Sequence, residues 1–319
     1  MKITEEIILN NYLKKLTFGK KSSLNLKDDV YFNEKNKIIV SIDSYEEGIH
    51  FINSSNPKTF VKKIFRASIS DLICKGSKPL VYFLSLSLNK INKKWLKSFS
   101  NELLSDSKKF GLYLGGGDTI RSKKLSISFT VIGFAKNKPV LRKTAKVNDD
   151  LYVTGNIGDS YLGLKILLKK INLGKFNEYF KKSFSYPNLH LNFSKQLYKF
   201  ANSSIDVSDG FIKDLSRLCE ASNCGAEVLF SKIPFSKNML YLNSIKKIKL
   251  KDIFSKGDDY QIMFTSSSKN RGLIKSISKK TRTKISRVGK IKSKKVIKLT
   301  NGDKIIDLSA FKTGYNHSF

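Results

Sequence analysis

Acidic residues are scarce in this chain of 319 residues, which has 26 Asp and Glu against 60 Lys and Arg and a formal net charge of +34. The basic excess is mostly lysine spread along the whole sequence, together with abundant Ile, Asn, Phe and Ser. An AT-rich genome encodes this mixture in any protein, so the charge alone is a weak indication of nucleic-acid binding. No RRM, KH, helix-turn-helix or zinc-finger signature accompanies it. We therefore expect no specific nucleic-acid partner.

Cysteine and long apolar runs are also rare. The three cysteines form no CxxC pair, and their odd number argues against a disulfide framework, so we expect a reducing, cytoplasmic location. The longest apolar run, residues 79–88, is half as long as the ~20 residues of a membrane span, so no membrane partner is expected. Residues 1–16 have apolar side chains at helical spacing and two glutamates, which predicts an amphipathic helix and not a signal peptide.

The common nucleotide-binding motifs are missing. The glycine run at residues 115–117 does not fit GxGxxG, because position 120 is Ile. The nearest approach to a Walker A sequence, Gly158 to Gly163, is followed by Leu164 where Lys and Ser or Thr are required. The HRD and DFG sequences of protein kinases are absent as well. If the protein transfers phosphate, it does so outside the P-loop and protein-kinase folds.

The few aspartates gather in short clusters beside apolar segments. Half-buried carboxylates are costly unless they are paired or bind a cation. Oxygen-rich sites without a neighbouring His and Cys set suit a hard divalent ion such as Mg²⁺. The pattern therefore predicts a magnesium site and phosphoryl transfer. In chain order the acidic positions are Asp28 and Asp29, Asp43, Asp71, Asp118, Asp206 and Asp209, and Asp258 and Asp259.

Helical and strand periods alternate along the chain, and 40% of its residues are hydrophobic, which predicts a globular fold of mixed α/β and α+β type. A polar stretch at residues 137–150 contains a proline and precedes a new strand, so we expect two domains, 1–140 and 141–319. The first half has predicted strands at 37–43, 80–88, 112–116 and 126–134 and helices at 56–75 and 93–109. The second half has a predicted helix at 159–170, another ending near Cys219, and strands at GAEVLF and YQIMFT.

Several acidic motifs have an ordinary structural alternative. Asp28 and Asp29 precede a strand and fit a turn. In the segment IDVSDG, Ser208 or Asp209 can cap the following helix, whereas the functional alternative has Asp206 and Asp209 as metal ligands with backbone N–H groups meeting phosphate.

Two further positions stay open between structure and function. Asp71 lies within an apolar helix face, where an ion pair with Arg66 or Lys75 is the alternative to a metal. His50, one of three histidines, follows Asp43 by seven residues, and a lone histidine is more often structural.

Taken together, these segments resemble the thiamine-monophosphate kinase family of the aminoimidazole-ribonucleotide-synthetase-like superfamily. Each motif is short, but their order and spacing match over nearly the whole chain. The matching segments are Asp28-Asp29, Ser41-Ile42-Asp43 followed by Glu47 to Phe51, Ala67 to Leu72, Gly116 to Thr119, Ile205 to Gly210, Gly257 to Tyr260, and Gly314 to His317 at the end of the chain.

The resemblance implies an N-terminal α/β domain whose sheet pairs with that of a second subunit in a homodimer, and a C-terminal α+β domain. It implies that ATP and several Mg²⁺ ions bind in the cleft between the domains. The implied reaction is direct in-line phosphoryl transfer from ATP to thiamine monophosphate, which gives thiamine diphosphate in the last step of its biosynthesis. Clustered metal ions would assist the transfer, and no general base would be needed.

The resemblance also implies roles for individual residues. It assigns Mg²⁺ binding to Asp29, Ser41, the Ile42 carbonyl, Asp43, Asp71, Asp118, Asp206 and Asp209. It assigns ATP binding to Gly117, Asp118, Arg142 and Ser208, and thiamine monophosphate binding to His50, Asp258 and an aromatic residue near the end, Phe311.

The chain departs from the usual pattern of the family at two positions. Lys27 stands where the family usually has Gly, and Asp258 stands where Glu is common.

A selenophosphate synthetase is disfavoured because no cysteine precedes Cys74, and an aminoimidazole ribonucleotide synthetase is disfavoured by the segment DSYEEGIHF at residues 43–51. A basic nucleic-acid-binding protein is the alternative from a different class, and it would not need the aspartates.

Overall fold

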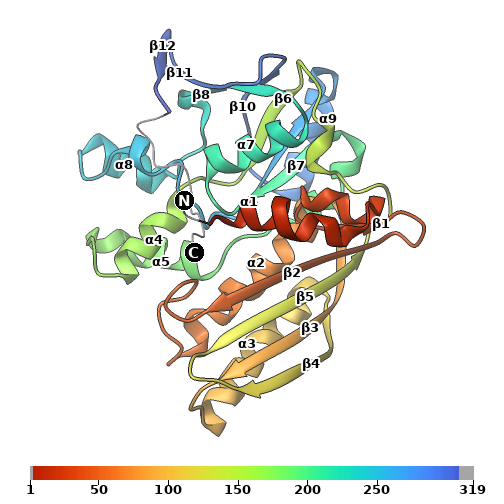
Figure 1. Cartoon of the computed structure of the whole chain (residues 1–319). Helices are drawn as coiled ribbons and strands as arrows, with labels where there is room; N and C mark the ends of the chain where they lie inside the picture. The colour runs from red at the N-terminus through yellow and green to blue at the C-terminus, as the bar shows by residue number, and fades with distance from the viewer. Residues whose placement is uncertain (1–2, 309–319) are drawn as a thin grey trace.

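The computed structural model describes residues 3–308 and is built on two β-sheets (Figure 1). The first sheet has five strands in the order β1-β2-β5-β3-β4. Only β3 and β4 run parallel, and the other neighbours are antiparallel. The strands are β1 Tyr31–Asn33, β2 Ile38–Glu46, β3 Lys78–Leu88, β4 Tyr113–Arg121 and β5 Ser126–Phe134.

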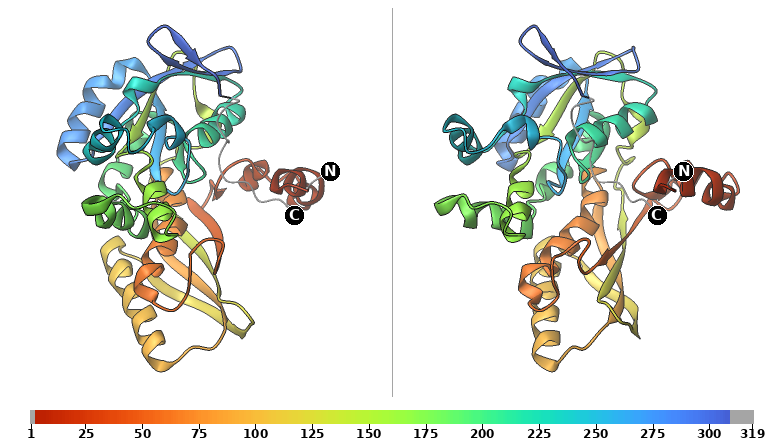
Figure 2. Two further views of the ribbon diagram at one scale, coloured as in Figure 1. Left: turned by 90° about the vertical axis from the view of Figure 1, so that its left-hand side faces the viewer. Right: turned by 60° about the vertical axis from the view of Figure 1, so that its left-hand side comes forward.

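One face of this sheet carries the helices α2, Val61–Cys74, and α3, Lys93–Phe110. Strand β5 alternates buried and half-buried residues, as expected for a strand with a single covered face. The opposite face is open in Figure 2, and two of its apolar side chains, Ile42 and Phe83, are 70% and 40% exposed. The sheet therefore has a packed face and a free face.

The second sheet has seven strands in the order β12-β11-β8-β10-β6-β9-β7. Of its strand pairs, only β8 and β11 are parallel. The predicted mixed α/β and α+β fold is thereby confirmed. The strands are β6 Asp150–Thr154, β7 Ala201–Val207, β8 Gly225–Leu229, β9 Gln261–Ser266, β10 Ile285–Lys292, β11 Ile297–Asn301 and β12 Lys304–Ile306. The helices of this half are α4 Asp159–Leu167, α5 Asn177–Ser185, α6 Leu191–Ser194, α7 Phe211–Ala221, α8 Lys237–Ser244 and α9 Arg271–Thr281.

Some elements differ from the sequence predictions at their ends. The helix predicted from residue 56 begins at Val61, because Pro57–Thr59 form a separate 3-10 turn capped by Asn56. The strand predicted to end at residue 116 continues to Arg121 as the sheet edge beside β3. The strands β10, β11 and β12 were not predicted, since alternating lysines on their exposed side dilute the apolar period.

The N-terminal segment is helical, but in short turns of different type, with α1 limited to Glu5–Ile7. Figure 2 shows this segment extending to the side of the molecule, and the side chains of Tyr12 and Leu16 are each 60% exposed. No helix within residues 3–308 combines the length and hydrophobicity needed to cross a membrane.

Helix α2 joins the two halves of the molecule. The Ser204 hydroxyl of β7 donates to the carbonyl of Cys74 at the end of α2, over 2.6 Å. The Ser70 hydroxyl of α2 donates to Asp206 at the end of β7, over 2.7 Å. These contacts bring the carboxyl end of β7 to the face of α2 that carries Asp71.

Candidate active site

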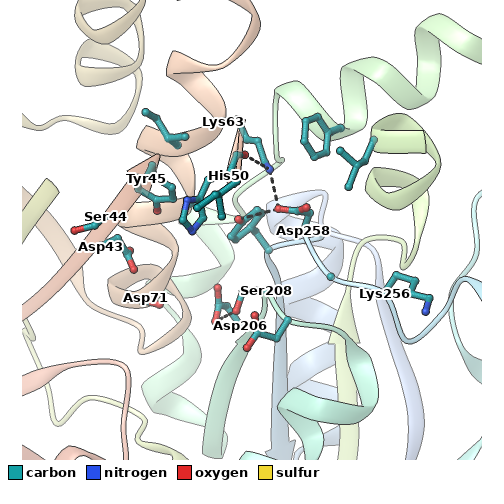
Figure 3. Close-up of a pocket in the computed structure, with 18 of the residues that line it drawn as sticks. Asp43, Ser44, Tyr45, His50, Lys63, Asp71, Asp206, Ser208, Lys256 and Asp258 are labelled. Atoms are coloured by element: carbon teal, nitrogen blue, oxygen red, sulfur yellow. Dashed lines mark hydrogen bonds and ion pairs between the residues drawn. The ribbon is translucent and has the colours of Figure 1, made fainter. Parts of the chain in front are cut away.

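A cavity of about 600 Å³ lies where α2 meets the second sheet (Figure 3). Its walls come from β2 and the loop after it, from α2, and from α4 and α5. The turn after β7 and the loop before β9 complete them. β2, the loop after it and α2 belong to the N-terminal half, as does Glu5 of α1, which also lines the cavity. The other elements belong to the C-terminal half, so the cavity depends on how the halves pack.

Three carboxyl groups gather at one end of the cavity (Figure 3): Asp43 from β2, Asp71 from α2 and Asp206 from β7. Desolvation raises the pKa of Asp43 to about 7, with a further contribution from Asp206, while a hydrogen bond from Tyr45 opposes the rise. Desolvation and the neighbouring carboxylates also raise the pKa of Asp71 well above its usual range. Like charges that raise each other's pKa in this way provide the oxygen-rich setting that a hard divalent cation neutralises.

Asp206 is the most buried member of this cluster, with 2% of its surface exposed. Burial raises its pKa, although the Ser70 hydroxyl, Arg142 and Lys75 act in the opposite direction. The hydroxyl of Ser208 also donates to its other oxygen, over 3.4 Å. The carboxylate is therefore oriented from two sides.

The turn after β7 positions Asp209 at the rim of the cavity. The backbone N–H groups of Asp209 and Gly210 each donate to Oδ2 of the fully buried Asp214 over 3.0 Å. Burial raises the pKa of Asp214 to about 7. Arg217 forms an ion pair with Asp209 over 2.7 Å. Asp214 therefore holds this turn through its carboxylate.

Asp29 lies beside the carboxyl cluster and is held by two cations. Its Oδ2 accepts from Nε of Arg142 over 3.0 Å and lies 2.9 Å from Nζ of Lys75. One of its oxygens also lies within 4.8 Å of Cys74 Sγ and of a carboxylate oxygen of Asp206. Arg142 is thus next to the predicted metal ligands.

The other end of the cavity contains His50 and Asp258, the predicted contacts of the phosphoryl acceptor (Figure 3). Nδ1 of His50 accepts from the backbone N–H of Glu46 over 3.0 Å. The hydroxyl of Tyr260 donates to Oδ1 of Asp258 over 3.2 Å. This end has fewer acidic groups and more aromatic surface, including Phe184.

Three predicted residues lie elsewhere. Ser41 is buried and donates its hydroxyl proton to the carbonyl of Ser68, whereas its neighbour Ile42 lines the cavity. Gly117 and Asp118 lie on the edge strand β4, and two strands separate them from β2. At about 4.8 Å per strand spacing, they are roughly 14 Å from the strand that carries Asp43. Phe311 lies outside the described residues.

The contacts of Asp71 and Asp259 distinguish a structural role from a functional one. Within residues 3–308 Asp71 has no ion-pair partner, because Arg66 pairs with Asp106 over 2.6 Å and Lys75 pairs with Asp28 and Asp29. Asp259 is buried and accepts from the backbone N–H of Gly158 over 2.8 Å, which is a structural role.

Sequence reasoning missed Lys63 and considered Lys75 only as a possible partner of Asp71. Lys63 lines the cavity, and Lys75 is fully buried beside Asp28 and Asp29. One signal for Lys63 was available, because it lies eight residues before Asp71 and therefore on the same helix face. In a chain with so much lysine this spacing did not stand out.

Comparisons with known proteins identify relatives of the chain in sequence and in fold. Residues 27–135 match the family model described as AIR synthase related protein, N-terminal domain. The chain is 35% identical to the thiamine-monophosphate kinase of Buchnera aphidicola subsp. Schizaphis graminum, with 89% of this chain and 88% of that protein covered. It is 34% identical to the thiamine-monophosphate kinase of Escherichia coli O157:H7, over 76% of this chain and 74% of that protein.

Solved structures show the same fold. A structure described as AaThiL complexed with AMPPCP and TMP superposes with a TM-score of 0.84 at 24% identity, covering 98% of this chain and 97% of that one. The thiamine monophosphate kinase of Aquifex aeolicus superposes with a TM-score of 0.79 at 24% identity, over 95% and 98% of the two chains. From the extent and identity of the sequence matches, the chain belongs to the thiamine-monophosphate kinase family.

Proposed function

We propose that the protein transfers the terminal phosphoryl group of ATP to thiamine monophosphate and so forms thiamine diphosphate. The observation that carries this proposal is the cluster of Asp43, Asp71 and Asp206 at one end of a cavity whose other end holds His50 and Asp258. Relatives that cover most of the chain are named for this activity, and the solved structure described above contains an ATP analogue and TMP.

The carboxyl cluster fits Mg²⁺, because its oxygens come from aspartates with raised pKa values and Asp71 has no cationic partner in the described chain. Bound Mg²⁺ ions would neutralise phosphate charge and align the donor with the acceptor. We assign them to Asp43, Asp71 and Asp206, with Asp29 and Asp209 at the margins. Ser41 and the Ile42 carbonyl stay predictions from the family resemblance.

The protein's own groups perform the remaining tasks. The guanidinium of Arg142 pairs with both oxygens of Asp29 beside the carboxyl cluster and can exchange these contacts for phosphate oxygens, and the Ser208 hydroxyl lines the cavity near Asp206. The acceptor is itself a phosphate at neutral pH and needs no strong base, so charge neutralisation and alignment supply the catalysis. A contact from helix α2 fixes Asp206, and contacts within the turn after β7 fix Asp209. These contacts provide the alignment.

We further propose that the protein works as a homodimer whose subunits pair through the free face of the first sheet. Exposed Ile42 and Phe83 on that face support this pairing. So does the position of Gly117 and Asp118, which lie on exposed edge strand β4, away from the cavity. A second copy would complete the ATP site with these two residues.

Two further proposals concern the domain boundary and the location of the protein in the cell. The two sheets lie on either side of residue 140 in the sequence, which supports domains at 1–140 and 141–319. The three cysteines are buried free thiols, which supports a cytoplasmic location.

The direct test is incubation of the purified chain with ATP, Mg²⁺ and thiamine monophosphate, with chromatographic detection of thiamine diphosphate and ADP. Equal amounts of both products are expected. ADP without thiamine diphosphate, or no turnover by folded protein, would contradict the proposal. Parallel incubations with selenide and with formylglycinamidine ribonucleotide test the two rival synthetase activities, for which no product is expected.

A further inference from the structure

Lys63 occupies an unusual position for a lysine, because it is almost completely buried in the wall of the cavity (Figure 3). Its Nζ lies 2.8 Å from Oδ1 of Asp258 and donates to the carbonyl of His50 over 3.2 Å. The same nitrogen lies 3.8 Å from the centre of the Phe184 ring. One ammonium group thus contacts both predicted acceptor-binding residues and an aromatic wall of the same cavity.

These partners come from separate parts of the chain. Lys63 is on α2, His50 is in the loop after β2, Phe184 is on α5, and Asp258 is in the loop before β9. A lysine has three protons to donate, and two acceptors and a ring face satisfy them. The ammonium is therefore fixed in direction as well as in place.

Asp258 is held through only one of its oxygens. Oδ1 forms the ion pair with Nζ of Lys63 and accepts the hydrogen bond of the Tyr260 hydroxyl. Oδ2 has no hydrogen-bond or ion-pair partner within residues 3–308. The side chain of Asp258 keeps 27% of its surface exposed although that of Lys63 keeps only 6%. The arrangement leaves one carboxylate oxygen available to a ligand in the cavity.

The backbone of the loop around Asp258 has an unusual conformation. Asp258 and Tyr260 have φ values of +70° and +50°, in the left-handed region, which aspartate tolerates but which is unfavourable for tyrosine. The Asp258 N–H donates to the carbonyl of Ser208 over 2.7 Å, next to the turn that holds Asp209. Such a loop conformation persists only where surrounding contacts hold it, and the contacts of Lys63 and Ser208 with Asp258 do so.

We propose that Lys63 is a positioning residue, which fixes Asp258 and His50 so that the free Asp258 oxygen and the Phe184 ring receive the cationic heteroaromatic part of the phosphoryl acceptor. This inference rests on the proposed function and deepens it. Lys63 would determine affinity for the acceptor and leave the affinity for ATP unchanged, because its contacts lie at the acceptor end. Its contacts to Asp258, His50 and Phe184 do not include Asp43, Asp71 or Asp206.

The test compares Lys63→Met and Lys63→Gln with Lys62→Met. Lys62 is the adjacent residue on α2, and it forms an ion pair with Glu102 over 3.1 Å away from the cavity. Calorimetry with thiamine monophosphate and, separately, with ATP gives the two affinities. We expect both Lys63 variants to lose about tenfold or more in acceptor affinity, with ATP affinity within about twofold and Lys62→Met like the wild type for both ligands.

A double-mutant cycle with Asp258→Asn shows whether Lys63 acts through Asp258. The double variant Lys63→Met with Asp258→Asn is expected to lose less acceptor affinity than the product of the two single losses, because Lys63 acts partly through Asp258 and partly through His50. Independent, multiplying losses would overturn the proposal, and so would wild-type acceptor affinity in both Lys63 variants or an equal loss for ATP. A wild-type protein that binds ATP but not thiamine monophosphate would instead refute the proposed function. Thermal unfolding of each variant confirms that folded protein is compared.

Discussion

The ammonium nitrogen of Lys75 lies 2.9 Å from Oδ2 of Asp29, and the lysine side chain is fully buried. It lies equally close to Oδ1 of Asp28 and donates to the carbonyl of Ser204 over 3.0 Å. Burial alone would lower the pKa of Lys75, but Asp28 and the other neighbouring acids outweigh it and raise that pKa above its usual value. A permanent positive charge therefore lies beside the proposed metal ligands.

Replacing Lys75 with Met should destabilise the protein strongly. The change leaves Asp28 and Asp29 buried without one of their cations, and removing one partner of a buried pair costs about 3–5 kcal/mol. At roughly 2–4 °C per kcal/mol, the midpoint of thermal unfolding should fall by about 6 °C or more. Lys124→Met is the control, because Lys124 pairs with Glu46 at the surface and its side chain is 69% exposed. An equal effect of the two substitutions would show that the Lys75 contacts contribute little.

Asp43→Asn and Asp209→Asn should each lower turnover by about a hundredfold or more, because each removes a charge from the proposed metal site. Neither should unfold the protein, and Asp43→Asn should raise the unfolding temperature measured without Mg²⁺, since it removes repulsion from Asp206. Steady-state kinetics and calorimetry measure the two effects. Asp252→Asn, at an exposed position, provides the control. Near-normal rates in both site variants would remove these residues from the metal site.

The stability of the ligand-free protein should fall as the pH rises from about 5 to 7. The pKa of Asp43 is about 7 in the folded protein and about 4 in an unfolded chain. Over this range the native state holds a proton that the unfolded state has released, so each pH unit costs roughly 1.4 kcal/mol per proton. Mg²⁺ competes with that proton, so the rise in unfolding temperature on adding Mg²⁺ should grow with pH. A rise that is the same at pH 5.5 and pH 8 would argue against binding at Asp43.

Gly210→Ala should impair activity by displacing the turn that carries Asp209. Gly210 has a φ of +125°, and a Cβ there would lie 2.2 Å from the carbonyl oxygen of Ser255. The matched control is Gly272→Ala on helix α9, where a Cβ meets nothing within 4 Å and should stabilise the helix by about 0.5–1 kcal/mol. Turnover measured beside thermal unfolding separates a displaced site from general instability. Unchanged turnover in Gly210→Ala would mean that this turn tolerates movement.

Phe83→Asp should convert the proposed homodimer into monomers, because Phe83 lies on the free face of the first sheet. Leu104→Asp is the comparison, since Leu104 is 52% exposed on α3, which covers the other face. Light scattering coupled to gel filtration gives the masses. A wild-type protein that is monomeric at assay concentrations, or a dimeric Phe83→Asp variant, would place any subunit contact elsewhere.

Much of the site could be predicted because its aspartates interrupt strong local patterns. Asp43 lies in an alternating strand, Asp71 on an apolar helix face, and Asp206 at the end of a strand, and the fold brings all three to one cavity. The contacts of Lys63 and Lys75 could not be predicted in this way. Their partners are distant in sequence, and apart from the helical spacing of Lys63 to Asp71 nothing local distinguishes these lysines from the solvent-exposed ones.

Helix α2 has a further consequence, because it connects both ends of the cavity by one rigid element. It spans 14 residues, or about 21 Å at 1.5 Å per residue. Lys63 is near its start, Asp71 is in its last turn, and Lys75 caps its end. The helix thus fixes the distance between Lys63, at the proposed acceptor end, and Asp71 in the carboxyl cluster. A single inserted residue would turn one end by about 100° relative to the other, so its length must stay fixed while the surrounding loops can vary.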